Sequence, residues 1–318
     1  MIGVDVDLAS TFLKEGKVVG IPTETVYGLA ANALNEDAVV SIYHIKNRPF
    51  FDPLILHFAN LESAEPYVLE IPEVAYQLGE QFWPGPLTLL LNKNDKIPDL
   101  ITSGSPKVAI RVPNHPLTLE LLSKINFPLA APSANPFGYI SPTRPEHVEK
   151  QLGDSLPYIL DGGECQVGIE STIIDCTEQS IRVLRLGGLS IQSIEACLGI
   201  KLDFKLNENS NPHAPGQLDK HYSPSTSFVL CDNIIEDYEK YKDQNPSLLV
   251  FGPFKNPKGI TVLNLSEKSD VDEAAKNLFH YMRELDNMKG SLILAMKLPE
   301  NGLGRAINDR LRRAAANS

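Results

Sequence analysis

One stretch near the amino terminus sets the pattern of the chain: Val18-Val19-Gly20-Ile21-Pro22-Thr23-Glu24-Thr25-Val26-Tyr27-Gly28-Leu29-Ala30-Ala31. Residues 18–21 predict a short buried strand, which ends at Pro22 because proline has no backbone N–H for a central ladder. In open α/β sheets, ligands bind at the carboxyl ends of strands. We therefore expect the polar side chains of residues 23–27 to lie in a crevice. The alternative is a polar turn that leads into a helix, with a threonine as N-cap.

The same design occurs again further along the chain. Residues 128–131 form a small apolar segment that ends at Pro132 and is followed by Ser133 and Asn135. Two strand ends that deliver hydroxyl and amide groups suggest one shared site. Two more predicted strands carry polar residues, His57 in residues 54–58 and Arg111 in residues 108–112. A lone histidine in a strand is more often a core residue, whereas a buried arginine must meet either a protein carboxylate or an anionic ligand.

Cationic residues also follow a predicted helix over residues 35–46, which ends before Pro49. Lys46 and Arg48 lie at its carboxyl end, where the helix dipole favours a cation by about 0.3–1 kcal/mol. That structural role would be small. Arg185 comes directly after a strand expected at residues 181–184. Lysine offers a point charge and arginine a planar fork, and both suit phosphate or carboxylate oxygens.

Length and composition limit the possible classes of protein. A chain of 318 residues suggests two domains. Its 29 Lys and Arg against 40 Asp and Glu give a net charge of −11, which argues against a surface that grips nucleic acid as a whole but allows a local pocket for a small anion. The acidic amino terminus and the lack of a long apolar run predict a cytoplasmic protein without a membrane span. The four widely spaced cysteines predict free buried thiols rather than a zinc site or disulfides.

The domain organisation follows from a change in composition. We expect a catalytic domain over residues 1–206, a polar linker over residues 207–224 that cannot pack as core, and a second domain over residues 225–318. In the last part, strands alternate with helices, which predicts a small Rossmann-like α/β unit. Neither a Gly-x-Gly-x-x-Gly fingerprint nor a phosphate-binding P-loop motif is present. The chain also lacks an evident nucleophile–base pair, which favours a reaction run by positioning and charge neutralisation, such as nucleotidyl transfer.

Seven short motifs together resemble the YrdC-like family of L-threonylcarbamoyladenylate synthases. They are, in order, Pro22-Thr23-Glu24-Thr25-Val26-Tyr27-Gly28-Leu29, Lys46-x-Arg48-Pro49, Asp52-Pro53-Leu54-Ile55, Arg111-Val112-Pro113, Ser133-Ala134-Asn135, Glu170-Ser171-Thr172, and Arg185 before Gly187. The segment 214–224, which contains His221 and Tyr222, resembles the long two-domain form of the family. This resemblance implies an α/β fold, a YrdC-like twisted open-sheet catalytic domain plus a smaller Rossmann-like domain.

The resemblance also implies an activity. L-threonine, bicarbonate or CO₂, and ATP would become threonylcarbamoyl-AMP and pyrophosphate, for N6-threonylcarbamoyladenosine at position 37 of tRNA. Mg²⁺ is expected on the ATP phosphates, with no separate metal site in the protein. The product would pass to a tRNA threonylcarbamoyl-transfer complex, and neither membrane association nor stable nucleic-acid binding is expected.

Site residues carry over from the same motifs. Threonine would be held by Thr23, Thr25, His57, Arg111 and Ser171, with Arg111 paired to its carboxylate. ATP would be held by Lys46, Arg48, Asp52, Ser133, Asn135, Ser141, Arg185 and Tyr222, with Lys46 and Arg48 as the catalytic residues. Asp52 stands where the usual motif has Asn, which puts a negative charge near the phosphates. We interpret the segment 214–224 as a lid that keeps water from the labile product.

Two other classes of function stay open. A tRNA- or double-stranded-RNA-binding module would need an extended basic face, which the charge balance disfavours. A related carbamoyl-transfer enzyme, similar to the YrdC-like part of hydrogenase maturation proteins, would be expected to carry acylphosphatase and zinc-finger regions, and the sequence shows neither.

Overall fold

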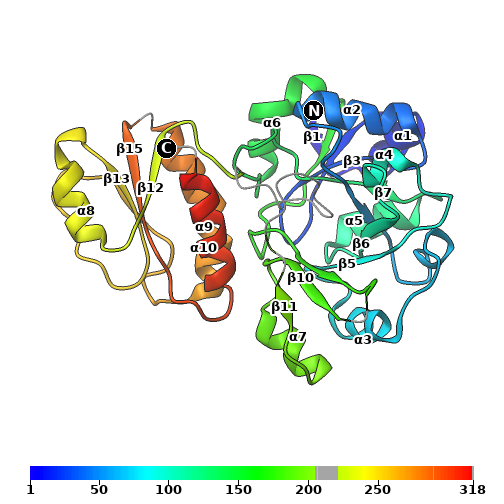
Figure 1. Cartoon of the computed structure of the whole chain (residues 1–318). Coiled ribbons are helices and arrows are strands. Elements are labelled where there is room, and N and C mark those ends of the chain that lie inside the picture. Colours follow the sequence, from blue (N-terminus) through cyan, green and yellow to red (C-terminus); the bar gives the residue numbers. More distant parts are fainter. Residues whose placement is uncertain (179, 205, 207–220, 289, 317–318) are drawn as a thin grey trace.

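Two β-sheets of unequal size organise the chain (Figure 1). The computed structural model describes all residues except 179, 205, 207–220, 289 and 317–318. The larger sheet is mixed and has eleven strands in the order β1-β8-β2-β3-β7-β4-β6-β5-β9-β10-β11. These strands are β1 (Ile2–Gly3), β2 (Val19–Ile21), β3 (Gly28–Asn32), β4 (Ile55–His57), β5 (Leu87–Asn92), β6 (Lys107–Arg111), β7 (Leu129–Ala130), β8 (Tyr158–Leu160), β9 (Thr172–Asp175), β10 (Arg182–Arg185) and β11 (Asp203–Phe204).

Helices surround this sheet and bury their apolar faces against it. They are α1 (Val6–Lys14), α2 (Glu36–Lys46), α3 (Glu73–Phe82), α4 (Asp99–Thr102), α5 (Pro116–Ser123), α6 (Pro145–Leu152) and α7 (Ile191–Leu198). In α2, Asn35 caps the amino terminus by accepting from the Ala38 backbone, and Asn47 ends the helix in the left-handed conformation. The chain therefore turns sharply between Lys46 and Arg48, and both side chains are brought back toward the sheet.

The predicted strand at the start of the chain is confirmed as β2, whose three residues are all buried. The structure excludes one of the two alternatives for the residues that follow Pro22. The polar turn after Pro22 leads into the antiparallel strand β3, with Ile21 opposite Gly28, so the reading of a turn into a helix is wrong. Pairing in the sheet decides this outcome, because β3 is also held on its other side by β7.

The smaller sheet belongs to a second unit that alternates strands and helices as expected. Its four strands are all parallel and lie in the order β12-β15-β13-β14. The elements are β12 (Ser227–Cys231), α8 (Ile234–Tyr241), β13 (Ser247–Val250), β14 (Val262–Asn264), α9 (Val271–Asn287), β15 (Leu292–Met296) and α10 (Gly304–Ala315). Figure 1 shows α9 and α10 on the side of this sheet that faces the first domain, and α8 on the far side. The predicted fold class is thus confirmed.

The end of the predicted linker packs more tightly than its composition indicates. Most of the linker, residues 207–220, lies outside the described residues. His221 and Tyr222 are buried, and the Tyr222 ring stacks on Phe279 of α9 with centroids 5.4 Å apart. The expectation that residues 207–224 cannot pack is therefore wrong at this end, because two aromatic rings fill the space between the domains. The domain boundaries themselves stay a prediction.

Two further expectations concern the whole chain. All four cysteines are free, and three of them, Cys165, Cys176 and Cys231, are buried, whereas Cys197 is half-buried. Among the described residues, no helix combines the length and the apolar character needed to cross a membrane. The cytoplasmic location stays a prediction.

Candidate active site

The polar turns identified in the sequence converge on one pocket of about 50 Å³. Nine of the predicted site residues line it, namely Thr23, Thr25, Arg48, His57, Arg111, Ser133, Ser171, Arg185 and Tyr222. They come from turns and strand ends distributed along the first domain and from the end of the linker. The shared site expected from the two strand-then-proline segments is therefore present in the structure.

The turn after β2 is fixed by its own hydroxyl groups. The Thr23 hydroxyl donates to the Val26 carbonyl oxygen over 2.6 Å and lies 2.8 Å from the Thr25 hydroxyl. It also accepts from the backbone N–H groups of Thr25 and Val26. These bonds hold both threonines rigidly at the pocket wall, because a short polar turn has few other ways to satisfy its buried backbone groups.

Arg111 is met by a carboxylate of the protein. Its Nη2 lies 2.8 Å from Glu24 Oε1, and both side chains are buried. Nε donates to the Gly85 carbonyl oxygen, and the other Glu24 oxygen accepts from the Asn114 backbone N–H over 3.0 Å. Of the two alternatives left open for a buried arginine, the structure shows the first. The pairing of Arg111 with a ligand carboxylate remains a prediction.

His57 lies opposite Arg111 in the register between β4 and β6. Burial, followed by the charge of Arg111, lowers the pKa of His57 to about 3. The imidazole is therefore neutral, and its Nδ1 has no hydrogen-bond partner among the described residues. A buried polar atom left unpaired in a pocket is a natural contact for a ligand.

Lys46 and Arg48 are held by backbone oxygens and not simply by a helix dipole. Lys46 Nζ donates to the carbonyl oxygens of Ser133 and Asn135, both over 2.5 Å, and the residue is only 1% exposed. Burial holds the pKa of Lys46 well below its usual value. The expectation of a small structural role is therefore wrong for Lys46, because its ammonium joins the end of α2 to the second polar turn.

Arg48 is tied to Asp52, the carboxylate expected near the phosphates. Its Nη2 lies 2.9 Å from Asp52 Oδ2 and donates to the Pro53 carbonyl oxygen over 2.8 Å, while Nε donates to the Asp52 carbonyl oxygen over 3.1 Å. Burial raises the pKa of Asp52, although Arg48 and Lys46 act against this effect. Asp52 thus serves as the counter-ion of Arg48.

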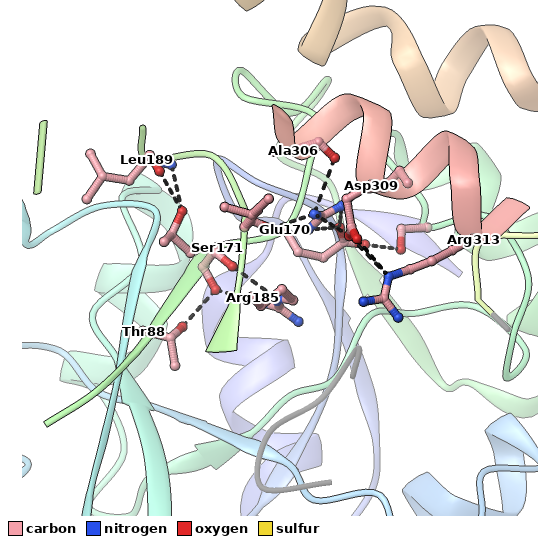
Figure 2. A network of polar contacts seen from close by, with 12 residues as sticks. Thr88, Glu170, Ser171, Arg185, Leu189, Ala306, Asp309 and Arg313 are labelled. Atoms are coloured by element: carbon pink, nitrogen blue, oxygen red, sulfur yellow. Dashed lines mark hydrogen bonds and ion pairs between the residues drawn. The ribbon is translucent and has the colours of Figure 1, made fainter. Parts of the chain in front are cut away.

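A third group of contacts joins β5, β9 and β10 (Figure 2). The Ser171 hydroxyl lies 2.7 Å from that of Thr88, and Arg185 donates from Nε to the Ser171 carbonyl oxygen and from Nη2 to its hydroxyl, each over 3.0 Å. Burial lowers the pKa of Arg185 to about 10, so its guanidinium stays charged at neutral pH. Gly187 allows this close approach, since a Cβ there would lie 2.3 Å from the Glu170 carbonyl oxygen.

Four predicted residues lie behind the pocket wall. Asn135 donates from Nδ2 to the carbonyl oxygens of Pro136 and Tyr139 and so shapes the second polar turn. The Ser141 hydroxyl donates to Glu170 Oε1 over 2.5 Å. Together with Lys46 and Asp52, they position the lining residues in this structure.

His221 and Tyr222 close the pocket from the linker side. Their rings meet edge to face, 4.1 Å between centroids, and Tyr222 has a left-handed backbone with φ of 63°. Burial raises the pKa of Tyr222 to about 12 and holds the pKa of His221 well below its usual value. Both rings are therefore neutral, as suits groups that cover a cluster of arginines without adding charge.

The pocket offers cations rather than metal ligands. Among the described residues, no group of three or more His, Cys, Asp or Glu side chains is placed to hold a metal ion. Each nearby carboxylate, Glu24, Asp52 or Glu170, is ion-paired with an arginine. The site therefore fits an anionic ligand and does not fit a protein-held Mg²⁺.

Glu170 is a lining residue whose role the sequence left unassigned. It stands in the Glu170-Ser171-Thr172 motif, which was the available signal. Its partner on the second domain, Arg310, lies 140 residues away and gives no local signal in the sequence.

Comparison with known proteins identifies the family of this chain. A family model described as "Telomere recombination", covering the Sua5, YciO and YrdC proteins, matches residues 11–187, and one described as "Threonylcarbamoyl-AMP synthase, C-terminal domain" matches residues 189–316. The chain belongs to the Sua5/YrdC family. The resemblance stated from the motifs, including the long two-domain form, is thereby confirmed.

Individual relatives of the Sua5/YrdC family extend the match over nearly the whole chain. The threonylcarbamoyl-AMP synthase of Pyrococcus abyssi is 41% identical over 97% of this chain and 93% of its own length, and that of Bacillus subtilis is 38% identical over 96% and 92%. The crystal structure of P. abyssi Sua5 complexed with L-threonine superposes with a TM-score of 0.92 at 40% identity, covering 98% of this chain and 94% of that one.

Proposed function

We propose that this chain is a threonylcarbamoyl-AMP synthase that converts L-threonine, bicarbonate and ATP into threonylcarbamoyl-AMP and pyrophosphate. One observation carries the proposal: three arginines, Arg48, Arg111 and Arg185, meet two hydroxyl-bearing turns in a single pocket. The full-length match to synthases supports the same reaction. The product would supply N6-threonylcarbamoyladenosine at position 37 of tRNA, through a separate threonylcarbamoyl-transfer complex.

We assign the threonine side of the pocket to Thr23, Thr25, His57, Arg111 and Ser171. The charge of Arg111 suits the threonine carboxylate, and the rigid threonine hydroxyls suit its polar groups. His57, with a pKa of about 3, is too weak a base to take a proton from an ammonium group at neutral pH. We therefore assign it a hydrogen bond to the substrate rather than a proton transfer.

We assign the ATP side to Lys46, Arg48, Ser133, Asn135, Ser141, Arg185 and Tyr222, with Asp52 as the counter-ion of Arg48. The rings of His221 and Tyr222 line this pocket on the linker side. We propose that they withdraw when a nucleotide enters. Their return would shut out water from the labile product.

The reaction requires two anions, the carbamate of threonine and ATP, to be brought together. Bicarbonate gives CO₂ by losing hydroxide, and the neutral threonine amine attacks the carbon of CO₂. One C=O π bond breaks as the N–C bond of a carbamate forms, and the proton released from nitrogen joins the hydroxide as water. A carbamate oxygen then attacks the α-phosphorus of ATP. The new P–O bond forms as the bond to the bridging oxygen breaks and pyrophosphate leaves. Arg48 and Arg185, which line the pocket, would neutralise the charge that builds up on the phosphates, and Lys46 would act from behind the wall by holding the turn that carries Ser133 and Asn135. We propose that Mg²⁺ arrives bound to ATP, because the pocket carboxylates are paired with arginines.

The test is pyrophosphate release by the full chain. We expect release from ATP only when threonine and bicarbonate are both present, with threonylcarbamoyl-AMP detected by mass spectrometry. Release without threonine, or none with all three substrates, would contradict the proposal. A gel shift with tRNA across a salt series tests the alternative function, an RNA-binding module. Such a module would bind tRNA tightly at low salt and lose affinity steeply as the salt concentration rises.

A further inference from the structure

A fully buried arginine of the second domain reaches the pocket of the first. Arg310, on α10, is 0% exposed. It donates from Nε and Nη2 to Glu170 Oε2, over 3.1 and 3.0 Å. Its Nη1 donates to the carbonyl oxygen of Leu186, the residue that follows Arg185. Figure 2 shows Glu170 between α10 and the strand ends that carry Ser171 and Arg185.

The second domain reaches Ser141 by two routes. Glu170 uses its second oxygen, Oε1, to accept from the Ser141 hydroxyl over 2.5 Å. Arg283 of α9 donates from Nε to the Ser141 carbonyl oxygen over 3.3 Å. Two arginines of the second domain thus hold the backbone and, through Glu170, the side chain of one residue assigned to ATP.

Charge balance explains why Arg310 is needed. Glu170 is a buried carboxylate that lines the pocket. A buried carboxylate without a counter-ion is costly. Without Arg310, the charge of Glu170 would stand unpaired in the pocket wall and repel the phosphates of ATP. Arg310 keeps Glu170 occupied, and its guanidinium also lies over the Tyr222 ring, 5.4 Å from the centroid.

We propose that Arg310 is a positioning residue for the ATP side of the pocket, acting through Glu170 on Ser141 and through the Leu186 carbonyl oxygen on the strand end that carries Arg185. The inference rests on the proposed function, and it gives the second domain a part in nucleotide binding. Arg310 need not touch ATP. Its effect is to neutralise and anchor a carboxylate in the pocket wall.

The experiment uses full-length variants and measures binding separately from turnover. Arg310→Lys keeps the charge but loses the two-pronged contact. We expect it to weaken ATP binding, titrated by calorimetry without threonine, about tenfold, and to leave threonine affinity within twofold of wild type. Arg312→Lys, an exposed position on the same helix, is the matched control and should change neither affinity.

A second pair of variants covers the case in which a charge change harms folding. Arg310→Gln leaves Glu170 buried and unpaired, whereas the double variant Arg310→Gln/Glu170→Gln removes both charges. We expect the double variant to bind ATP more tightly than the single one, because an unpaired carboxylate in the pocket wall then no longer repels the phosphates. Unchanged ATP affinity in Arg310→Lys, or equal losses of ATP and threonine affinity in all variants, would overturn the proposal. Normal binding of both ligands without pyrophosphate release by the wild type would instead contradict the proposed reaction.

Discussion

The two domains place their buried charged residues in different kinds of structure. In the first domain, apart from Lys46 at the end of α2, these residues lie in turns, like Glu24 and Arg48, or at strand ends, like Arg111 and Arg185. In the second domain the buried arginines lie on the helices α9 and α10, and both Arg283 and Arg310 donate to the first domain (Figure 1). The described part of the small sheet contributes no strand end to the pocket.

This difference indicates a division of labour. Turns and strand ends can direct a side chain at a ligand, because the backbone there is not hydrogen-bonded to a neighbouring strand. A helix face that is packed between domains instead presents counter-charges at fixed positions. We therefore expect substitutions in the first domain to act directly on substrates and those in the second domain to act through pairing.

The largest effect is expected for Arg48→Ala. It removes a pocket cation and leaves Asp52 buried without its ion pair. Loss of one preorganised charge from a closed site lowers kcat/KM by about 10²–10³-fold. Pyrophosphate release measures the change, and Arg312→Ala serves as an exposed control. Wild-type kcat/KM in Arg48→Ala would remove this loop from the ATP site.

Lys46→Ala should lose both turnover and stability. Two hydrogen bonds from a buried ammonium contribute more than the helix dipole alone, and we expect the free energy of unfolding to fall by about 2–3 kcal/mol. Denaturant unfolding measures this difference. Lys14→Ala is the matched control, since Lys14 also lies in the last turn of a helix but is exposed. A change as small as that of Lys14→Ala would show that the carbonyl contacts contribute little.

Arg111→Lys is expected to weaken threonine binding about tenfold, because a point charge cannot reproduce the contacts of a planar fork. Its contacts with Glu24 and Gly85 would also be altered. Calorimetric titration with threonine measures the loss, and ATP affinity serves as the internal control. Unchanged threonine affinity would place the carboxylate elsewhere in the pocket.

The smallest effect concerns pH. Burial lowers the pKa of His57 and of His147 to about 3, whereas an unfolded histidine has a pKa near 6.5. The unfolded state therefore binds more protons below about pH 6.5, so stability is complete above that pH and falls as the solution is acidified toward pH 3. We expect the unfolding temperature to drop between pH 7 and pH 5.

His147 ties this effect to the contact between the domains, since its ring stacks on His280 of α9 with centroids 5.6 Å apart. The variant His147→Gln should show a shallower loss of stability on acidification than the wild type. An unfolding temperature that stays level or rises between pH 7 and pH 5 would contradict this account.

The sequence determined the elements of this protein and much of its site. Alternating apolar strands and helices are local patterns, so the α/β alternation of the second domain was predicted. Strands that end at Pro22 and Pro132 predicted where polar side chains collect, and the motifs around Lys46, Arg111 and Ser171 indicated the family. Each of these signals depends on residues that are neighbours in the chain.

Only the tertiary structure decided which charges pair. Glu24 forms an ion pair with Arg111, and Glu170 with Arg310. Strand pairing and helix packing bring these residues together although they are 87 and 140 positions apart in the sequence. The same packing buries Lys46 and Tyr222. The sequence had indicated only a small structural role for Lys46 at a helix end, and a polar linker around Tyr222. Hydrophobic periodicity fixes which face of an element is buried, but the partner of a buried charge depends on the neighbour that packing places beside it.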